Sequence, residues 1–408
     1  MKFLVQKFGG TSVANPDLRQ IVARKVLSAR ESGYTPVVVV SAMGRKGEPY
    51  ATDSLLAMAQ QVSADIAGRD LDLLMSCGEV ISGVVMSATL QSIGCPAISL
   101  TGAQAGIITD NSFNEARILK VDVSNIVRHA REGRVVVVAG FQGVTEDGDV
   151  TTLGRGGSDT TAAALGAALK AVYVDIYTDV EGIMTADPRI VTEARTLEAI
   201  TYDELCHLAH EGAKVIHPRA VEIAMQKGIP LRVRPAFSEA AGTLVTSSGE
   251  VYKGTVDIVR DKIITGITHI MDLTQFRVIV DNNLEGLKEQ QRMFRSLALA
   301  GISIDFINVL PGLVLFTVRE DVSGKALQVL ENLGFKPEVQ AGCAKVSAVG
   351  AGMAGVPGVI ADIVEALTRE HINIMQCNDS HTTVWVLVKQ EVMEKAIRAL
   401  HRQFLPVH

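Results

Sequence analysis

The side chains that could carry chemistry lie in glycine-containing segments that follow strand-like runs. The first segment, KFGGTS at 7–12, comes directly after an apolar start to the chain. Its two glycines would let the backbone approach an anion closely, and Lys7 supplies a mobile positive charge. It is neither a P-loop nor a GxGxxG dinucleotide motif. Taken alone, the segment fits a tight turn as well as a phosphate site.

A second segment, GRGGSDTT at 154–161, leads into an alanine-rich helical pattern. Glycines before a helix start, with Ser158 and Asp159 in capping position, form an N-terminus that binds anions. A flexible loop with an ordinary cap is the alternative interpretation. Arg155 favours a functional site, because its planar guanidinium suits a carboxylate and the flanking glycines leave it accessible.

Two further polar loops, TDVEG at 178–182 and TADPR at 185–189, follow the strand-like run VYVDIYT. They could be surface turns, or their Asp and Arg side chains could meet a nucleotide. Lys214, within GAKVIHPRA, has a simple alternative role as a cation at a helix C-terminus. His207 and His210 lack a third ligand nearby, so the sequence predicts no protein-held metal site.

The chain shows no Ser-His-Asp arrangement and no environment for a catalytic cysteine. A carboxylate substrate has a pKa of about 4 and is already ionised at neutral pH, so its phosphorylation needs no general base. That reaction needs charge neutralisation around the phosphoryl group, in-line positioning and Mg2+. Lysines, glycine amides and a few carboxylates would supply these requirements.

The elements that must position these segments alternate between strand and helix over the range 1–245. Continuous Val/Ile runs are typical of parallel strands covered on both faces, and strand–helix alternation predicts βαβ units in an open sheet. Ligands bind such sheets at the carboxyl ends of the strands, where the glycine segments lie. The clearest strands are expected at 3–8, 36–42, 134–141 and 172–178, and helices at 17–32, 53–67, 78–93, 159–170 and 201–211.

The alternation of strands and helices ends at the Gly/Ser/Ala-rich segment 234–250. Shorter elements follow it, and they contain an internal repeat. Residues 294–307 align with 364–377, and 321–330 align with 391–400 at the same offset, without a gap. Each copy predicts a helix, a strand, a hairpin strand and a helix. Because the match is collinear over four elements, we expect two copies of a small α+β module.

Composition limits the function classes. The 408 residues carry a formal net charge of -6 and no block of Lys and Arg, which argues against nucleic-acid binding. Five scattered cysteines without a CxxC pair favour a reducing compartment. The N-terminal apolar run is too short for a signal peptide, and no later stretch of membrane-spanning length is free of charge. We therefore expect a soluble cytoplasmic protein with no membrane partner.

Together the segments resemble the aspartokinases of the amino-acid kinase superfamily. KFGGTS, SAMG at 41–44, GRGGSDTTA, TDVEGIMTADPR and GAKVIHPRA occur in that family in this order. The resemblance spans nearly the whole chain, and the repeated modules resemble the tandem ACT domains of such enzymes. SAMGRKGEPYATDSLL (41–56) and NDSHTTVWVLV (378–388) resemble the diaminopimelate-sensitive aspartokinase I type of Bacillus-like bacteria.

The resemblance implies a three-layer αβα amino-acid kinase fold with a mainly parallel sheet, followed by two ferredoxin-like α+β ACT domains. The catalytic domain is expected at 1–245 and a linker at 246–262. The first ACT region is expected at 263–342 and the second at 343–408. The chain ends soon after its last helix, so the second module is short of a strand. We expect 263–271 to complete it, with the first module inserted between.

The resemblance also implies roles for individual residues. Lys7, Asp159 and Lys214 are expected to be catalytic, with Asp159 holding the lysine. Aspartate is expected to contact Thr52, Glu79, Arg155, Gly156, Gly157 and Ser158. The ATP site is expected to comprise Lys7, Phe8, Gly9, Gly10, Ser41, Thr178, Asp179, Met184, Asp187, Arg189 and Lys214. Mg2+ would be held mainly by phosphates and water.

The expected reaction is ATP-dependent phosphorylation of the β-carboxylate of L-aspartate, the first step towards lysine, threonine and methionine. An amino-acid effector is expected at the ACT domains, with diaminopimelate, lysine and threonine all open. ACT modules usually pair edge to edge, so a homodimer or higher assembly is expected. A sister acid kinase, such as glutamate 5-kinase, and a catalytically silent amino-acid sensor are the alternatives.

Overall fold

The computed structural model describes residues 1–63, 65–213, 215–247, 263–350, 353 and 356–406. These residues form two compact units. The first contains 1–183, 196–210 and 215–247, and the second contains 184–195, 211–213 and the described residues from 263 onwards. Two short segments of the expected 1–245 domain thus belong to the second unit. The expected linker lies outside the described residues except for 246 and 247.

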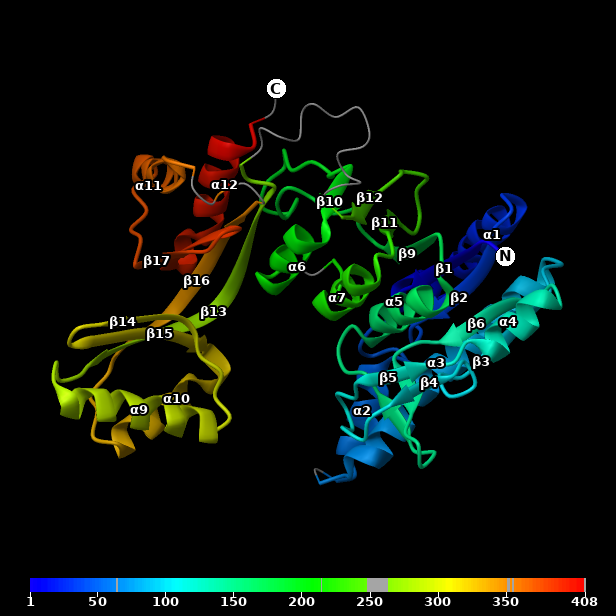
Figure 1. Cartoon of the computed structure of the whole chain (residues 1–408), viewed down its shortest axis with the longest axis horizontal. Coiled ribbons are helices and arrows are strands. Elements are labelled where there is room, and N and C mark those ends of the chain that lie inside the picture. The colour runs from blue at the N-terminus through cyan, green and yellow to red at the C-terminus, as the bar shows by residue number, and fades with distance from the viewer. Residues whose placement is uncertain (64, 214, 248–262, 351–352, 354–355, 407–408) are drawn as a thin grey trace. The chain divides into compact units, whose positions relative to one another are not determined.

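The first unit is built on a mainly parallel sheet with β1 near its centre (Figure 1). β1 pairs in parallel with β2 and β9, and the β11–β12 pair is antiparallel. Val37 to Val40 in β2 are completely buried, as expected for strands covered on both faces. The strand order is β10 (Ala199–Thr201), β12 (Thr243–Thr246), β11 (Leu231–Pro235), β9 (Tyr173–Thr178), β1 (Phe3–Phe8), β2 (Thr35–Val40), β6 (Val135–Ala139) and β3 (Ala97–Leu100).

Helices cover both faces of this sheet, which confirms the expected three-layer αβα fold. On one face α1 (Pro16–Glu31) and α3 (Gly68–Ser92) pack over a core that includes Phe8 and Tyr177. On the other face α5 (Gly157–Leu169) packs over β1, β2 and β9. α7 (Pro218–Lys227) packs against α5, and α6 (Tyr202–His210) packs against α7.

A smaller sheet contains the strand that leads into the loop before α5. Its order is β5 (Ile118–Val121), β4 (Ile107–Thr109), β7 (Gln142–Val144) and β8 (Val150–Thr152). β8 ends just before the glycine-rich loop at 154–157. Two more helices complete the unit: α2 (Thr52–Gln60), which packs against α3, and α4 (Ser124–Arg131), which packs beside β6.

The helix pattern expected at 78–93 begins earlier, at Gly68, and the one expected at 53–67 ends at Gln60. The early turns of α3 are held by Asp72, which is completely buried. Its carboxylate accepts hydrogen bonds from Asn114 N at 3.0 Å, Thr152 N at 2.8 Å and Thr152 Oγ1 at 2.6 Å. These contacts join α3 to β8, and no helical periodicity reveals them.

Within the described residues, α3 is also the one helix long and apolar enough to cross a bilayer. Half of its most apolar stretch is buried inside the first unit. Met86 and Leu90 of α3 belong to the core beneath α1. The apolar character of α3 therefore reflects packing in a protein core.

The second unit is a six-stranded antiparallel sheet flanked by two helix pairs (Figure 1). α9 (Leu284–Leu299) and α10 (Glu320–Asn332) pack on one core, and α11 (Val359–Arg369) and α12 (Met393–Phe404) pack on another. The strand order is β14 (Asp305–Leu310), β15 (Leu313–Arg319), β13 (Gly266–Ile279), β16 (Glu338–Val349), β18 (Thr383–Lys389) and β17 (Gln376–Asp379). β15 and β18 occupy equivalent positions in the two copies of the sequence repeat.

β13 is shared between the two modules. Its residues 266–270 pair with 345–349 of β16, which in turn pair with β18 of the second module. Its residues 273–279 pair with β15 of the first module. The start of β13 thus lies where a strand that completes the second module would lie, with the first module inserted after it.

Replacing Asp72 with alanine should destabilise the first unit by about 3 kcal/mol, because buried donors of Asn114 and Thr152 would lose their acceptor. Urea unfolding followed by circular dichroism measures this change as a lower midpoint. Asp70→Ala is the matched control, since Asp70 lies on the same helix but is exposed. Its effect should stay within about 0.5 kcal/mol. Equal midpoints for the two variants would contradict the role given to Asp72.

Candidate active site

Lys7 and Asp159 form a largely buried ion pair at the carboxyl end of β1. Side chains alternate along a strand, so Lys7 points to the face that α5 covers. Asp159 lies in the first turn of α5, and its Oδ1 is 2.8 Å from Lys7 Nζ. The exposed fractions of the two side chains are only 13% and 10%. His217 N donates a further hydrogen bond to Asp159 Oδ2 at 3.3 Å.

The loops that follow β1 and β2 are locked together through backbone atoms. Gly44 N donates to Gly10 O at 3.0 Å, and Ser41 N donates to Phe8 O at 3.2 Å. A Cβ on Gly10 would lie 2.2 Å from Ala42 O, so only glycine fits there. KFGGTS and SAMG therefore form one turn cluster beside Lys7.

Phe8 contributes to this cluster only through its backbone. Its side chain is completely buried on the α1 face and stacks on Tyr177, with ring centroids 4.5 Å apart. The strand alternation that turns Lys7 towards α5 turns Phe8 into the core. The phenyl ring is therefore part of the fold.

Glu79 of α3 reaches the same cluster. Its Oε1 accepts a hydrogen bond from Ala42 N at 3.0 Å, while its Oε2 is buried and has no partner among the described residues. Burial raises the pKa of Glu79 to about 8, against the smaller opposing effect of the Ala42 amide. The carboxyl group is therefore mostly protonated at neutral pH. Thr52, half-buried, is the first residue of α2.

The loop between β8 and α5 presents Arg155 to solvent. Gly156 has a φ of 67°, and a Cβ there would lie 2.3 Å from the His217 side chain. Gly157 and Ser158 are buried in the first turn of α5. The glycines thus let the loop pass close to His217 and leave the guanidinium of Arg155 outside.

Thr178 is the last residue of β9, the strand next to β1, and Asp179 follows it. Thr178 Oγ1 donates to Asp179 Oδ1 at 3.3 Å, and Arg45 pairs with Asp179 Oδ2 at 3.3 Å. Both members of the Arg45–Asp179 pair are exposed. The carboxyl ends of β1, β2 and β9 therefore bring together residues from three of the predicted segments.

Met184, Asp187 and Arg189 belong to the second unit. Arg189 donates to both carboxylate oxygens of Asp187, which lowers the pKa of Asp187. This segment is tied to β13 because Ile267 N donates to Thr185 O at 2.8 Å. Lys214 lies outside the described residues.

Sequence reasoning missed Ala42, Arg45 and His217 as partners in this region. Ala42 and His217 contribute backbone amides, which carry no signature in residue type. Arg45 follows SAMG directly, and its charge was the only available signal.

No group of three or more His, Cys, Asp or Glu that could hold a metal ion occurs in the part of the chain that the structure describes.

Comparison with known proteins assigns families to both ends of the chain. Residues 2–235 match the amino acid kinase family, and residues 338–402 match the ACT domain. Aspartokinase 1 of Bacillus subtilis (strain 168) is 50% identical over 404 residues, which cover 99% of each chain. An aspartokinase of Geobacillus stearothermophilus is 42% identical over 99% of this chain and 97% of its own.

Solved structures give the same result. E. coli aspartokinase III in complex with aspartate and ADP, described as the R-state, superposes with a TM-score of 0.77 at 26% identity and covers 98% of this chain and 99% of its own. The same enzyme with lysine and aspartate, described as the T-state, gives a TM-score of 0.76 at 27% identity over 99% of both chains. The chain belongs to the aspartokinase family, within the amino acid kinase family.

Proposed function

We propose that the chain transfers the γ-phosphoryl group of ATP to the β-carboxylate of L-aspartate, which yields 4-phospho-L-aspartate and ADP. This is the first step towards lysine, threonine and methionine, by way of diaminopimelate for lysine. The observation that carries the proposal is the largely buried Lys7–Asp159 ion pair beside the KFGGTS–SAMG turn cluster. The 50% sequence identity to an aspartokinase over 99% of both chains supports it.

The proposed acceptor is tested by measuring ADP release with L-aspartate, glutamate, N-acetylglutamate and UMP in turn. Turnover with aspartate alone supports the proposal. Turnover with only one of the other three would replace it with a sister kinase, and no turnover with any of them would favour a silent amino-acid sensor.

Lys7 would neutralise the negative charge that develops on the transferring phosphoryl group. Asp159 keeps Lys7 in place through the 2.8 Å ion pair. Gly9 and Gly10 would donate amides to the phosphates, since their turn lies beside the lysine. The acceptor carboxylate is already ionised, so no side chain has to remove a proton.

Aspartate would be held by its charged groups. Arg155, exposed beside the α5 N-terminus, would clamp the α-carboxylate with help from Ser158 and the neighbouring amides of Gly156 and Gly157. Glu79 would bind the ammonium group, because its Oε2 is buried and unpaired among the described residues. Thr52 would complete the contact from the first turn of α2.

Mg2+ would bind together with the nucleotide phosphates. It would neutralise phosphate charge and orient the phosphates, and it usually keeps several waters with one or two carboxylates. Asp159, whose carboxylate lies 2.8 Å from Lys7 Nζ, would help to organise the ion and the phosphates. The proposed nucleotide contacts are the backbone of Phe8, Ser41, Thr178, Asp179, Met184, Asp187, Arg189 and Lys214.

Feedback control would act through the second unit. Residues 338–402 match the ACT domain, and the first module repeats the same elements earlier in the chain. We propose that both are ACT domains that bind an amino-acid effector, in a cytoplasmic homodimer or higher assembly. Diaminopimelate, lysine and threonine, added singly and in pairs to the ADP assay, identify the effector.

Lys7→Ala should lower kcat about a thousandfold, because it removes charge stabilisation in the transition state. A coupled ADP assay at saturating substrates measures the loss. Lys2→Ala is the matched control, since Lys2 is exposed and lies on the same segment. Near-normal kcat in Lys7→Ala, with an unchanged melting temperature, would contradict the assigned role.

The KM for aspartate should fall about tenfold per unit as pH rises from 6 to 8, and then level off. Glu79 is protonated below its pKa of about 8, and it must lose that proton before it can bind the substrate ammonium. Glu79→Gln, which mimics the protonated form, should raise KM and flatten this dependence while kcat changes little. A wild-type KM that is constant between pH 6 and 8 would refute the role of Glu79.

A further inference from the structure

The face of the sheet opposite Lys7 carries charged side chains over β9 and β11. Gln6 on β1 pairs in register with Asp175 on β9, which pairs in register with Arg232 on β11. The next row on the same face contains Tyr177 and Arg234. Helices normally cover both faces of a parallel sheet, with apolar side chains between. A charged face at this point therefore requires an explanation other than packing.

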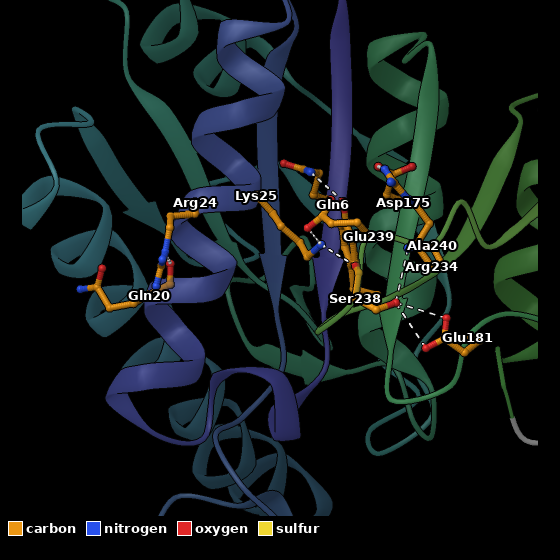
Figure 2. Close-up of polar contacts among 11 residues, drawn as sticks. Gln6, Gln20, Arg24, Lys25, Asp175, Glu181, Arg234, Ser238, Glu239 and Ala240 are labelled. Atoms are coloured by element: carbon orange, nitrogen blue, oxygen red, sulfur yellow. Dashed lines mark hydrogen bonds and ion pairs between the residues drawn. The ribbon is translucent and has the colours of Figure 1, made fainter.

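A cavity of about 560 Å3 lies between these strands and α1. Such a volume is within the range of small-molecule sites. Lys25 of α1 reaches the segment after β11, where its Nζ donates to Ser238 O at 2.9 Å and to Glu239 Oε1 at 3.0 Å (Figure 2). The cavity thus has walls from α1, from three strands and from this segment.

The lining of this cavity carries a surplus of positive charge. Its cations are Arg24, Lys25, Arg232 and Arg234, and its carboxylates are Asp175 and Glu239. Asp175, completely buried, accepts two hydrogen bonds from Arg232, at 2.7 and 2.9 Å. Glu239 pairs with Lys25. The two carboxylates are thereby occupied by two of the four cations.

Of the other two cations, Arg24 has no carboxylate partner among the described residues and Arg234 has only a share in Asp175. Within the described residues Arg24 forms no ion pair, and its Nε donates only to Gln20 O in its own helix. Arg234 lies 3.6 Å from the already occupied Asp175, and its Nε is buried without a hydrogen-bond partner in the same set of residues. The lining therefore has two more cations than carboxylates, and a cleft lined mainly by one sign of charge attracts ions of the opposite sign.

Gln6 supplies a second, independent indication of a ligand. It lines the cavity with only 1% of its surface exposed, and its Oε1 has no partner among the described residues. Its Nε2 makes a long contact of 3.3 Å with Tyr177 OH. Burial, followed by the charge of Asp175, raises the pKa of Tyr177 to about 12, so the phenol stays protonated. Turning the amide over would let Oε1 accept from Tyr177 and would free the Gln6 NH2 group for an anion.

We propose that this cavity binds a small anion through phosphate or carboxylate groups, held by the guanidinium groups of Arg24 and Arg234 with the amide of Gln6. The site lies on the opposite face of β1 from Lys7. It is therefore distinct from the turn cluster proposed to hold the substrates, and its occupation does not require turnover.

Isothermal titration of inorganic phosphate, and separately of succinate, into the full chain tests the proposal. Saturating ADP is present to fill the proposed nucleotide site, and sodium chloride matches the ionic strength. At least one anion should bind, and Arg24→Gln and Arg234→Gln should each weaken that binding about tenfold, as for the loss of one charge-assisted contact. Arg30→Gln, the same change on α1 but outside the cavity lining, should leave binding unchanged.

Because Arg24 is exposed, its substitution spares the core and keeps the test valid if Arg234→Gln folds poorly. Binding of phosphate alone would identify a phosphorylated ligand, and binding of succinate alone would identify a carboxylate ligand. No binding of either anion would overturn the proposal. So would binding seen only in a parallel titration without ADP, or binding that Arg24→Gln and Arg30→Gln weaken equally.

Discussion

The ion pair between Lys7 and Asp159 depends on most of the first unit. It needs β1 near the centre of the sheet, α5 on the correct face and the glycine loop that delivers the start of α5. Removing two charges from water costs several kcal/mol per ion. The 2.8 Å contact, the His217 amide and the position of Asp159 in the first turn of α5 offset part of that cost. A pair of this kind adds little net stability, which is consistent with a functional reason for its presence.

Alternation along β1 assigns neighbouring residues to separate tasks. Lys7 faces α5 and Asp159, whereas Gln6 and Phe8 face α1. Phe8 stacks on Tyr177 and closes the core, while Gln6 borders a charged cavity. One central strand therefore borders the proposed phosphate turn on one face and both a core and a charged cavity on the other.

The second unit contains two segments that lie far upstream in sequence. Thr185 shares a hydrogen bond with His401 of α12 at 3.0 Å, and its carbonyl accepts from β13. Glu211 pairs with the buried Lys345 of β16 at 3.0 Å. The segments around Thr185 and Glu211 are thus bonded directly to the sheet and helices of the second unit, although they lie far upstream in sequence.

The sequence by itself determined the fold class, the central strands, the internal repeat and the family. Continuous Val/Ile runs and glycine motifs are local patterns, so they can be recognised without the structure. The β1 range 3–8 is identical in prediction and structure, and the expected 172–178 strand differs from β9 only at its first residue. Only the tertiary structure decided that α3 begins at Gly68, that the Phe8 ring is core and that the pKa of Glu79 is raised. It also decided that the strand expected within 263–271 continues to Ile279 and pairs there with β15 of the first module. Each of these depends on segments distant in sequence, such as Thr152 beside Asp72 or Ala42 beside Glu79, and local periodicity carries no information about such neighbours.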